Sequence, residues 1–184
     1  MDSQWTGCEE QDPDVVLMRE AAGGSLDAFS SLMRRHQDPL VNFFRRMGVY
    51  TDAEDLVQET FVRLYKARLR YRSSAKFTTY LYVIARHVLA DHGRKWFRRE
   101  RLRKGLRVEA EVAVAGGPTQ GWRIDVEAAL ARLSPKLRSV VVLSIYQGLK
   151  QEEIAEVLGI PRGTVKSRMN LAIRELKEFF DADR

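Results

Sequence analysis

Apolar residues near the C-terminal end of the chain recur with the period of an α-helix. Successive apolar positions are separated by four, three, four and three residues, at Val165, Met169, Ala172, Leu176 and Phe179. Side chains at these intervals share one face of a helix. The pattern therefore predicts a long helix with a single buried stripe.

The segment before this helix has the chemistry of a second helix and a tight turn. Ile154, Ala155 and Leu158 give the shorter helix an apolar face. Gly159 can adopt the left-handed conformation that ends a helix, and Pro161 suits the first turn of the next one. Together the two helices predict a helix-turn-helix.

Polar and cationic side chains of the longer helix lie largely outside its apolar stripe. They are Arg162, Lys166, Ser167, Asn170 and Arg174. In a helix that enters a major groove, these groups reach phosphates and base edges. An ordinary helical hairpin with a solvated basic face would show the same period, but the turn chemistry and the placement of the cations favour DNA binding.

The N-terminal part of the chain also follows a helical period. A first helix is expected from Asp12 or Asp14 toward Ala22. Ser25 caps a second helix, which Pro39 is expected to kink or split.

Two more helices are expected before position 105. Residues 51–54 have the composition of a capping box, and the stripe that follows is Leu56, Val57, Phe61, Leu64 and Tyr65. Ser73 or Ser74 opens the next helix, whose core-facing residues are Phe77, Tyr80, Leu81, Ile84, Val88 and Leu89.

Residues 103–123 are glycine-rich and have no sustained period, so they predict a flexible linker. A second helical set begins near Ile124, with a strong helix start at Ser134 and Pro135. We find no internal repeat and no strand pair with hairpin chemistry. The expected fold is all-α, with two small helical domains joined by a flexible linker and a helix-turn-helix in the second.

Charge is distributed unevenly along the chain. Residues 94–104 carry seven cations and one anion, whereas residues 1–60 carry twelve acidic and five basic side chains. The basic segment suits a nucleic acid, and the acidic part suits a basic protein partner.

Several function classes are disfavoured. The acidic N-terminus lacks the apolar segment of a signal peptide, and no run of about twenty apolar residues occurs, so we expect a cytoplasmic protein without membrane insertion. Cys8 is the only cysteine, which excludes an internal disulfide. His87 and His92 lack the spacing of a helical metal site, and no phosphate loop or nucleophile motif occurs. We expect no enzyme activity, metal or cofactor.

Three segments, 52–61, 77–87 and 148–170, resemble successive motifs of bacterial extracytoplasmic-function (ECF) RNA polymerase sigma factors. The resemblance extends over about residues 12–180. It implies that residues 12–102 form sigma region 2, which binds core polymerase and recognises and melts the promoter's −10 element. Residues 103–123 would be the linker. Residues 124–180 would form region 4, whose helix-turn-helix reads the −35 element.

The resemblance also implies partners, namely core RNA polymerase through its clamp coiled coil and flap, promoter DNA, and an anti-sigma factor. The polymerase-binding candidates lie off the apolar stripe near a helix N-terminus, and they are Asp52, Asp55, Gln58 and Glu59. A solvated, helix-capping face would have the same composition.

The −10 candidates are Tyr80, Tyr82, Arg86, His87, Arg94, Lys95 and Arg98, with Trp96, Phe97 and Arg99 as further ones. Cations can follow phosphates, while aromatic or hydrogen-bonding groups can capture an unstacked base. Core packing explains Tyr80 slightly better than a direct contact with DNA. The sequence departs from the family at His87, where many members have asparagine, and at Tyr80, where many have tryptophan.

The −35 candidates are Arg162, Thr164, Lys166, Ser167, Arg168, Asn170 and Arg174. In the family, the positions of Lys166, Ser167 and Asn170 face bases. Ser144 stands where many members have arginine, which weakens any borrowed promoter consensus. A stand-alone dimeric helix-turn-helix regulator and a helical adaptor without a DNA role are the alternatives.

Overall fold

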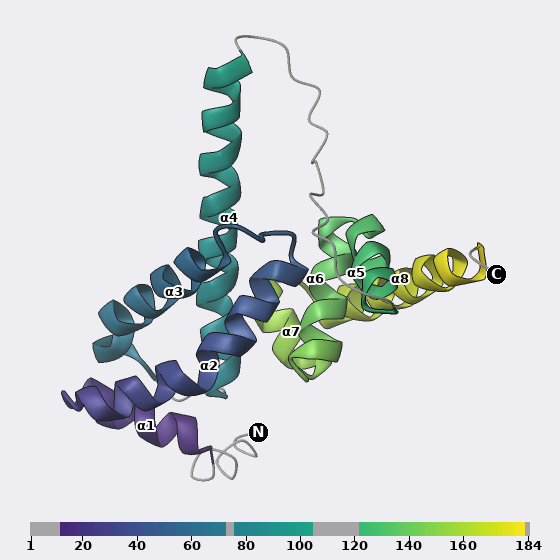
Figure 1. Ribbon diagram of the computed structural model, residues 1–184. Coiled ribbons are helices and arrows are strands. Elements are labelled where there is room, and N and C mark those ends of the chain that lie inside the picture. The colour runs from purple at the N-terminus through teal and green to yellow at the C-terminus, as the bar shows by residue number, and fades with distance from the viewer. Residues whose placement is uncertain (1–11, 73–75, 105–121, 183–184) are drawn as a thin grey trace.

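In the computed structural model of the protein, residues 12–72, 76–104 and 122–182 are described, and every regular element among them is helical (Figure 1). The elements are α1 Pro13–Ala22, α2 Leu26–Arg46, α3 Ala53–Ala67, the 3₁₀ turn η1 Arg68–Arg70, α4 Phe77–Lys104, α5 Trp122–Arg132, α6 Pro135–Val141, the π-helical turn η2 Val142–Tyr146, α7 Gln151–Leu158 and α8 Arg162–Ala182. The all-α expectation is confirmed.

Some expectations fall where nothing is described. Cys8, Ser73 and Ser74 lie outside the described residues, as does most of the expected linker. The linker's first and last expected positions belong to helices, because α4 extends to Lys104 and α5 begins at Trp122.

Asp12 holds the starts of two helices that are distant in sequence. One carboxylate oxygen accepts from the Asp14 backbone N–H at 3.0 Å, as an N-cap of α1. The other accepts from the Phe77 backbone N–H at 3.3 Å, at the start of α4. The first turns of both helices therefore share one anion, which also suits their dipoles.

Helix α2 is capped as expected but is not split. The Ser25 hydroxyl accepts from the Ala28 backbone N–H at 3.2 Å. The helix then continues through Pro39 to Arg46. The loss of one backbone hydrogen bond at Pro39 is tolerated because Leu40 and Phe44 beyond it are fully buried.

The capping box expected at the start of α3 is wrong. The N-cap is Asp52, not Thr51, and no side chain bonds the free backbone donors there. The Asp52 carboxylate instead pairs with His92 Nε2 on α4 at 2.9 Å. The Asp52 side chain therefore serves a contact between helices and not the cap of its own helix.

Helix α4 stands at the centre of the fold. Figure 1 shows α3 to the left of it, α2 crossing it, and the helices of the second set to its right. Its N-terminal half buries Phe77, Leu81, Ile84, Ala85 and Val88. The apolar cluster around them is continuous from α1–α4 into η2, α7 and the start of α8.

The second helical set contributes to two clusters. Ile154 and Val157 of α7 and Val165 of α8 belong to the central cluster. A smaller cluster joins α5, α6 and α8 through Leu130, Leu133, Leu137, Val141 and Ala172. The two helical sets are therefore packed against each other through α4 and α7.

Polar contacts reinforce this packing between the two sets. The Tyr82 hydroxyl of α4 donates to the side-chain oxygen of Gln147, which follows the π-helical turn η2. The Arg46 guanidinium lies 3.9 Å from the centre of the Tyr146 ring. Lys76 Nζ pairs with Glu153 Oε1 at 3.0 Å. We call this set of contacts the closed interface.

The turn between α7 and α8 has the geometry that the sequence predicted. Gly159 is left-handed, with φ of 65° and ψ of 39°. The Ile160 backbone N–H donates to the Ala155 carbonyl at 3.1 Å, which closes the end of α7. The helix-turn-helix is thus confirmed as a structural motif.

Removing the shared cap should destabilise the fold. We expect Asp12→Ala to lower the free energy of unfolding by about 1–2 kcal/mol, because two helix starts lose an acceptor. Urea denaturation followed by circular dichroism measures this change. Asp38→Ala is the matched control, since Asp38 is exposed on α2 and pairs with no described residue. Equal losses for the two variants would contradict the shared-cap role.

Candidate functional site

The acidic face of α3 consists of Asp52, Asp55, Gln58 and Glu59. Asp55 and Gln58 are exposed and form no ion pair or side-chain hydrogen bond with any described residue. Asp52 is engaged with His92, and Glu59 Oε1 accepts from Arg63 Nε at 2.7 Å. Asp55 and Gln58 are therefore available to a partner at once, whereas Asp52 and Glu59 must exchange an existing contact.

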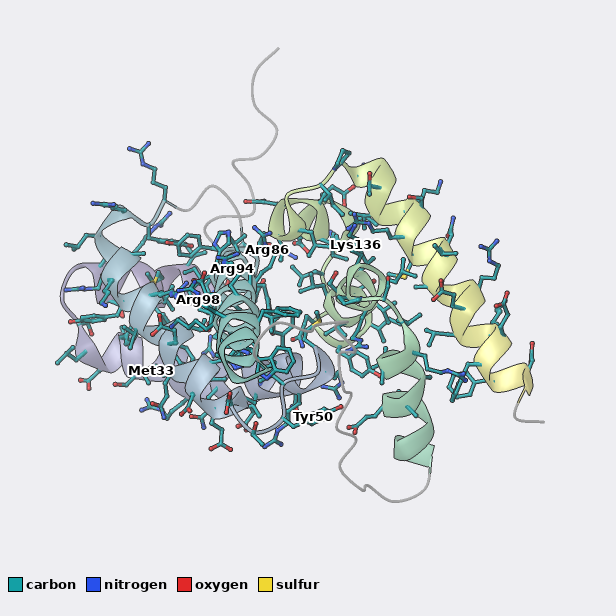
Figure 2. All side chains as sticks on the ribbon, turned by 90° about the horizontal axis from the view of Figure 1, so that it is seen from above. Met33, Tyr50, Arg86, Arg94, Arg98 and Lys136 are labelled. Atoms are coloured by element: carbon teal, nitrogen blue, oxygen red, sulfur yellow. The ribbon has the colours of Figure 1, made fainter. Side chains whose placement is uncertain are left out.

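The basic face of α4 consists of Arg86, His87, Arg94, Lys95 and Arg98. All are exposed except Arg86, which is half-buried. Figure 2, which looks along α4, shows Arg86, Arg94 and Arg98 on the same side of this helix. In Figure 1 the C-terminal half of α4 projects beyond the other helices. A rigid, projecting row of cations can follow a phosphate backbone.

The two tyrosines of the −10 set lie in different surroundings. Tyr80 is half-buried beside Tyr71, with 5.2 Å between ring centres, and burial raises the pKa of its hydroxyl. Tyr82 is only 2% exposed, packs on Phe43 at 5.2 Å, and donates to Gln147 across the closed interface. Burial raises the pKa of Tyr82 as well. In this arrangement the Tyr82 ring packs on α2 of the first helical set, and its hydroxyl is engaged by Gln147 of the second.

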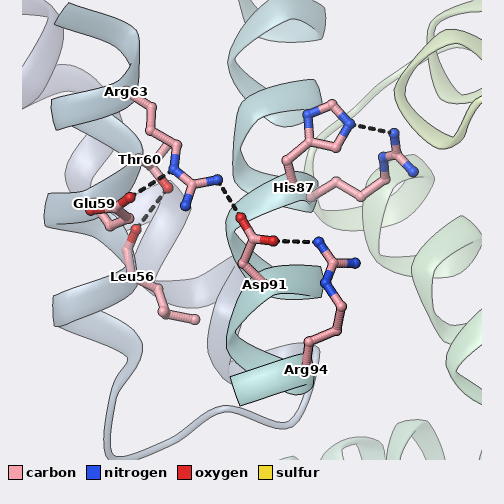
Figure 3. Close-up of polar contacts among 8 residues, drawn as sticks. Leu56, Glu59, Thr60, Arg63, His87, Asp91 and Arg94 are labelled. Atoms are coloured by element: carbon pink, nitrogen blue, oxygen red, sulfur yellow. Dashed lines mark hydrogen bonds and ion pairs between the residues drawn. The ribbon is translucent and has the colours of Figure 1, made fainter. Parts of the chain in front are cut away.

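The surroundings of His87 disfavour its protonated form. Arg86 Nη2 lies 2.9 Å from His87 Nε2 (Figure 3). A guanidinium can only donate, so Nε2 accepts and the ring proton is assigned to Nδ1. Partial burial and then the charge of Arg86 lower the pKa of His87, while Asp91 opposes them. The exposed Nδ1–H is a donor that a base could accept from.

An ion-pair chain joins the acidic face of α3 to the basic face of α4 (Figure 3). Arg63 Nε donates to Glu59 and Arg63 Nη1 donates to Asp91 Oδ2, both at 2.7 Å. The other oxygen of Asp91 accepts from Arg94. The hydrogen bonds that Arg63 donates, first to Glu59 and then to Asp91, raise the pKa of Arg63, and the one that Asp91 accepts from Arg63 is the largest cause lowering the pKa of Asp91.

Sequence reasoning did not select Arg63 or Asp91. Each has a partner one helical turn away, Glu59 for Arg63 and Arg94 for Asp91, which indicates local pairing only. The contact between the two side chains joins residues 28 positions apart, and nothing in the pattern signals it.

The candidate readers on α8 remain open to solvent. Lys166, Ser167, Asn170 and Arg174 are exposed, and Arg168 is half-buried. Arg162 pairs with Glu152 of α7 at 2.7 Å. The Ser167 hydroxyl donates to the Thr164 carbonyl at 3.1 Å. The closed interface therefore leaves this face accessible while it engages the Tyr82 hydroxyl.

Other kinds of site find no support among the described residues. No group of three or more side chains that could hold a metal ion occurs among them. None of their helices combines the length and apolarity needed to cross a membrane.

Comparisons with known proteins match the two helical sets to two known families of domains. The family model for sigma-70 region 2 matches residues 32–101, and the model for sigma-70 region 4 matches residues 123–176. The chain is 32% identical to the ECF RNA polymerase sigma factor SigE of Mycolicibacterium smegmatis, over 97% of this chain and 72% of that protein. It is also 32% identical to the RNA polymerase sigma factor CnrH of Cupriavidus metallidurans, over 94% and 97%.

Solved structures show the same fold. CnrH in complex with the cytosolic domain of CnrY matches with a TM-score of 0.71 at 30% identity, covering 94% of this chain and all of that one. The sigma factor RpoE of Bartonella quintana, solved with the anti-sigma factor NepR, matches with a TM-score of 0.72 at 24% identity, over 86% of this chain.

The lowered pKa of His87 can be tested by NMR titration of the imidazole nitrogens. We expect its pKa to lie below the ordinary value of 6.5, to rise in Arg86→Gln and to fall further in Asp91→Asn. Because folding disfavours the protonated ring, this group opposes folding increasingly as the pH falls through the ordinary pKa toward the lowered one. Shifts in the same direction for both variants would refute the charge assignment.

Proposed function

The chain belongs to the ECF RNA polymerase sigma factors, and on this premise we propose how its surfaces divide the work of starting transcription. Residues 12–102 bind core polymerase and open the −10 element, residues 124–180 read the −35 element, and residues 103–123 connect them. The protein acts in the cytoplasm, and polymerase performs the chemistry.

Polymerase docks on the acidic face of α3. The exposure of Asp55 and Gln58 supports this assignment, because their side chains can meet a basic coiled coil of the clamp without first breaking an internal contact. The helix-turn-helix domain contacts the flap.

The basic face of α4 receives the −10 element. Arg94, Lys95 and Arg98 hold phosphates, and His87 offers its ring donor to a base that has left the stack. Tighter binding of the unpaired strand offsets the cost of unstacking, so melting requires no catalysis.

The exposed face of α8 reads the −35 element in duplex DNA. Lys166 and Asn170 can donate to guanine and pair with adenine, respectively, and Ser167 adds a hydroxyl. Arg162, Thr164, Arg168 and Arg174 lie nearer the phosphates.

An anti-sigma factor keeps the protein silent. CnrH, whose fold this chain shares, was solved with the cytosolic domain of CnrY. The observation that supports regulation here is the closed interface, which engages the hydroxyl of the buried Tyr82 of the −10 set. A regulator that stabilises this arrangement prevents Tyr82 from reaching DNA.

Reconstitution with core polymerase tests the proposed function. We expect the holoenzyme to initiate at a small set of genomic promoters, detected by run-off transcription. Asp55→Lys should weaken core binding at least several-fold, because it replaces an exposed anion with a cation opposite a basic partner. Glu20→Lys, an exposed site on α1, is the matched charge control. Absence of initiation above core alone would overturn the function.

The closed interface should open when polymerase binds. In a Cys8→Ser background, dyes on cysteines replacing Val62 of α3 and Ile173 of α8, both exposed, should report the separation of the two helical sets. We expect energy transfer to fall on addition of core polymerase, since Tyr82 must be uncovered to contact DNA. Unchanged transfer in an initiating holoenzyme would show that Tyr82 stays covered and plays no part in binding DNA.

A further inference from the structure

Asp91 is an acidic side chain beside the surface that is proposed to hold phosphates. Its carboxylate is about one-third exposed and lies next to Arg94 on the basic face of α4. It is also close enough to His87 for its charge to act on the imidazole ring. An unneutralised carboxylate at this position would repel a DNA backbone and compete for Arg94.

The neutralising charge comes from a different helix. Arg63 of α3 donates to Asp91 at 2.7 Å with a nitrogen that Glu59 does not use. Figure 3 shows the guanidinium between the two carboxylates, with Asp91 then reaching Arg94 on its other side. Arg63 and Arg94 therefore occupy different oxygens of the same carboxylate.

In the proposed function, DNA binding breaks the contact between Arg94 and Asp91. When Arg94 turns from Asp91 to a phosphate, Asp91 keeps only Arg63 as its cationic partner. Arg63 already holds Asp91 from α3 and is two-thirds buried, so it can stay in place without meeting DNA.

We propose that Arg63 is a positioning residue for promoter binding, which acts by neutralising Asp91 so that Arg94 is released to the phosphate backbone. This inference rests on the proposed function. The inference extends that function, because it assigns a role in DNA binding to Arg63, a residue that lies on the polymerase-binding helix and does not itself touch DNA.

Polymerase docking reinforces the same exchange. Glu59 belongs to the acidic face of α3, and a polymerase cation that engages it removes one of the two anions from Arg63. The guanidinium is then left to Asp91 alone, which favours the release of Arg94. Polymerase binding and phosphate binding are thereby positively coupled through one side chain, and such coupling is reciprocal.

A double-mutant cycle tests the role of Arg63. The variants are Arg63→Gln, Asp91→Asn and the two combined, each assembled with core polymerase and titrated with a promoter fragment that the wild-type holoenzyme transcribes. We expect Arg63→Gln to weaken DNA binding by about two- to fivefold at low salt, the size of an exposed charge interaction. Adding Asp91→Asn should restore wild-type affinity, because no carboxylate then needs neutralising. The defect of the single variant should shrink as salt rises.

Matched controls isolate the charge effect from net charge and from folding. Arg34→Gln, at an exposed site on α2, removes one positive charge, as Arg63→Gln does. Glu20→Gln, at an exposed site on α1, removes one negative charge, as Asp91→Asn does. Both controls should leave DNA binding unchanged. Core-binding affinity and thermal stability, measured for each variant, separate a loss of docking or folding from a loss of DNA contact.

Each outcome of the cycle decides the matter. A loss in Arg63→Gln that Asp91→Asn does not restore would mean that Arg63 contacts DNA directly or only ties α3 to α4, and it would overturn the inference. Wild-type DNA binding in Arg63→Gln would overturn it too. If the wild-type factor itself fails to initiate transcription, the proposed function is wrong. If the wild type initiates but Asp91→Asn does not rescue Arg63→Gln, only the role of Arg63 is wrong.

Discussion

The packing of α4 on both of its sides is the constraint on which the rest of the molecule depends. Apolar residues occur around much of its N-terminal half, so this segment is stable only when helices cover it from more than one direction. Helices α1–α3 and α7 provide that cover, and one apolar cluster results. The C-terminal half is polar and projects beyond the core (Figure 1). The core thus fixes the direction of the basic face.

The same constraint links the two helical sets. Each helical set is small and has only a modest core of its own, and the contact between α4 and α7 joins the two into a larger core. The polar contacts of the closed interface fix how the two helical sets are oriented but add little to the free energy of their association. Lys76 and Arg46 lie near the surface, where charge pairs contribute little. Closure of this kind can be reversed by a partner with a few kcal/mol of differential binding energy.

Local chemistry explains which parts of the fold were predictable. Ser25, Ser134 and Gly159 act on backbone groups within a few residues, and all three end or begin a helix as expected. The capping box failed because α3 begins at Ala53, which makes Asp52 rather than Thr51 the N-cap, and the Asp52 carboxylate bonds His92 on another helix. Pro39 failed to split α2 because packing beyond it outweighs one lost hydrogen bond.

The candidate surfaces divide in the same way. Exposed polar and cationic side chains on one side of a periodic helix could be placed from sequence, as Asn170 and Lys166 show. The hydrogen bond from the Tyr82 hydroxyl could not, because its acceptor Gln147 lies 65 positions away, after a π-helical turn with no sequence signal.

A surface that serves two partners cannot be described by its own charges alone. The acidic face of α3 and the basic face of α4 are neighbours, so each would weaken the other's binding without an intervening neutral pair. Arg63 and Asp91 form that pair at the junction of the two helices. Their charges cancel each other, while Glu59, which is about half exposed, and Arg94, which is about two-thirds exposed, can exchange partners at low cost. Opposite charges can therefore lie side by side on this fold and still act on different macromolecules.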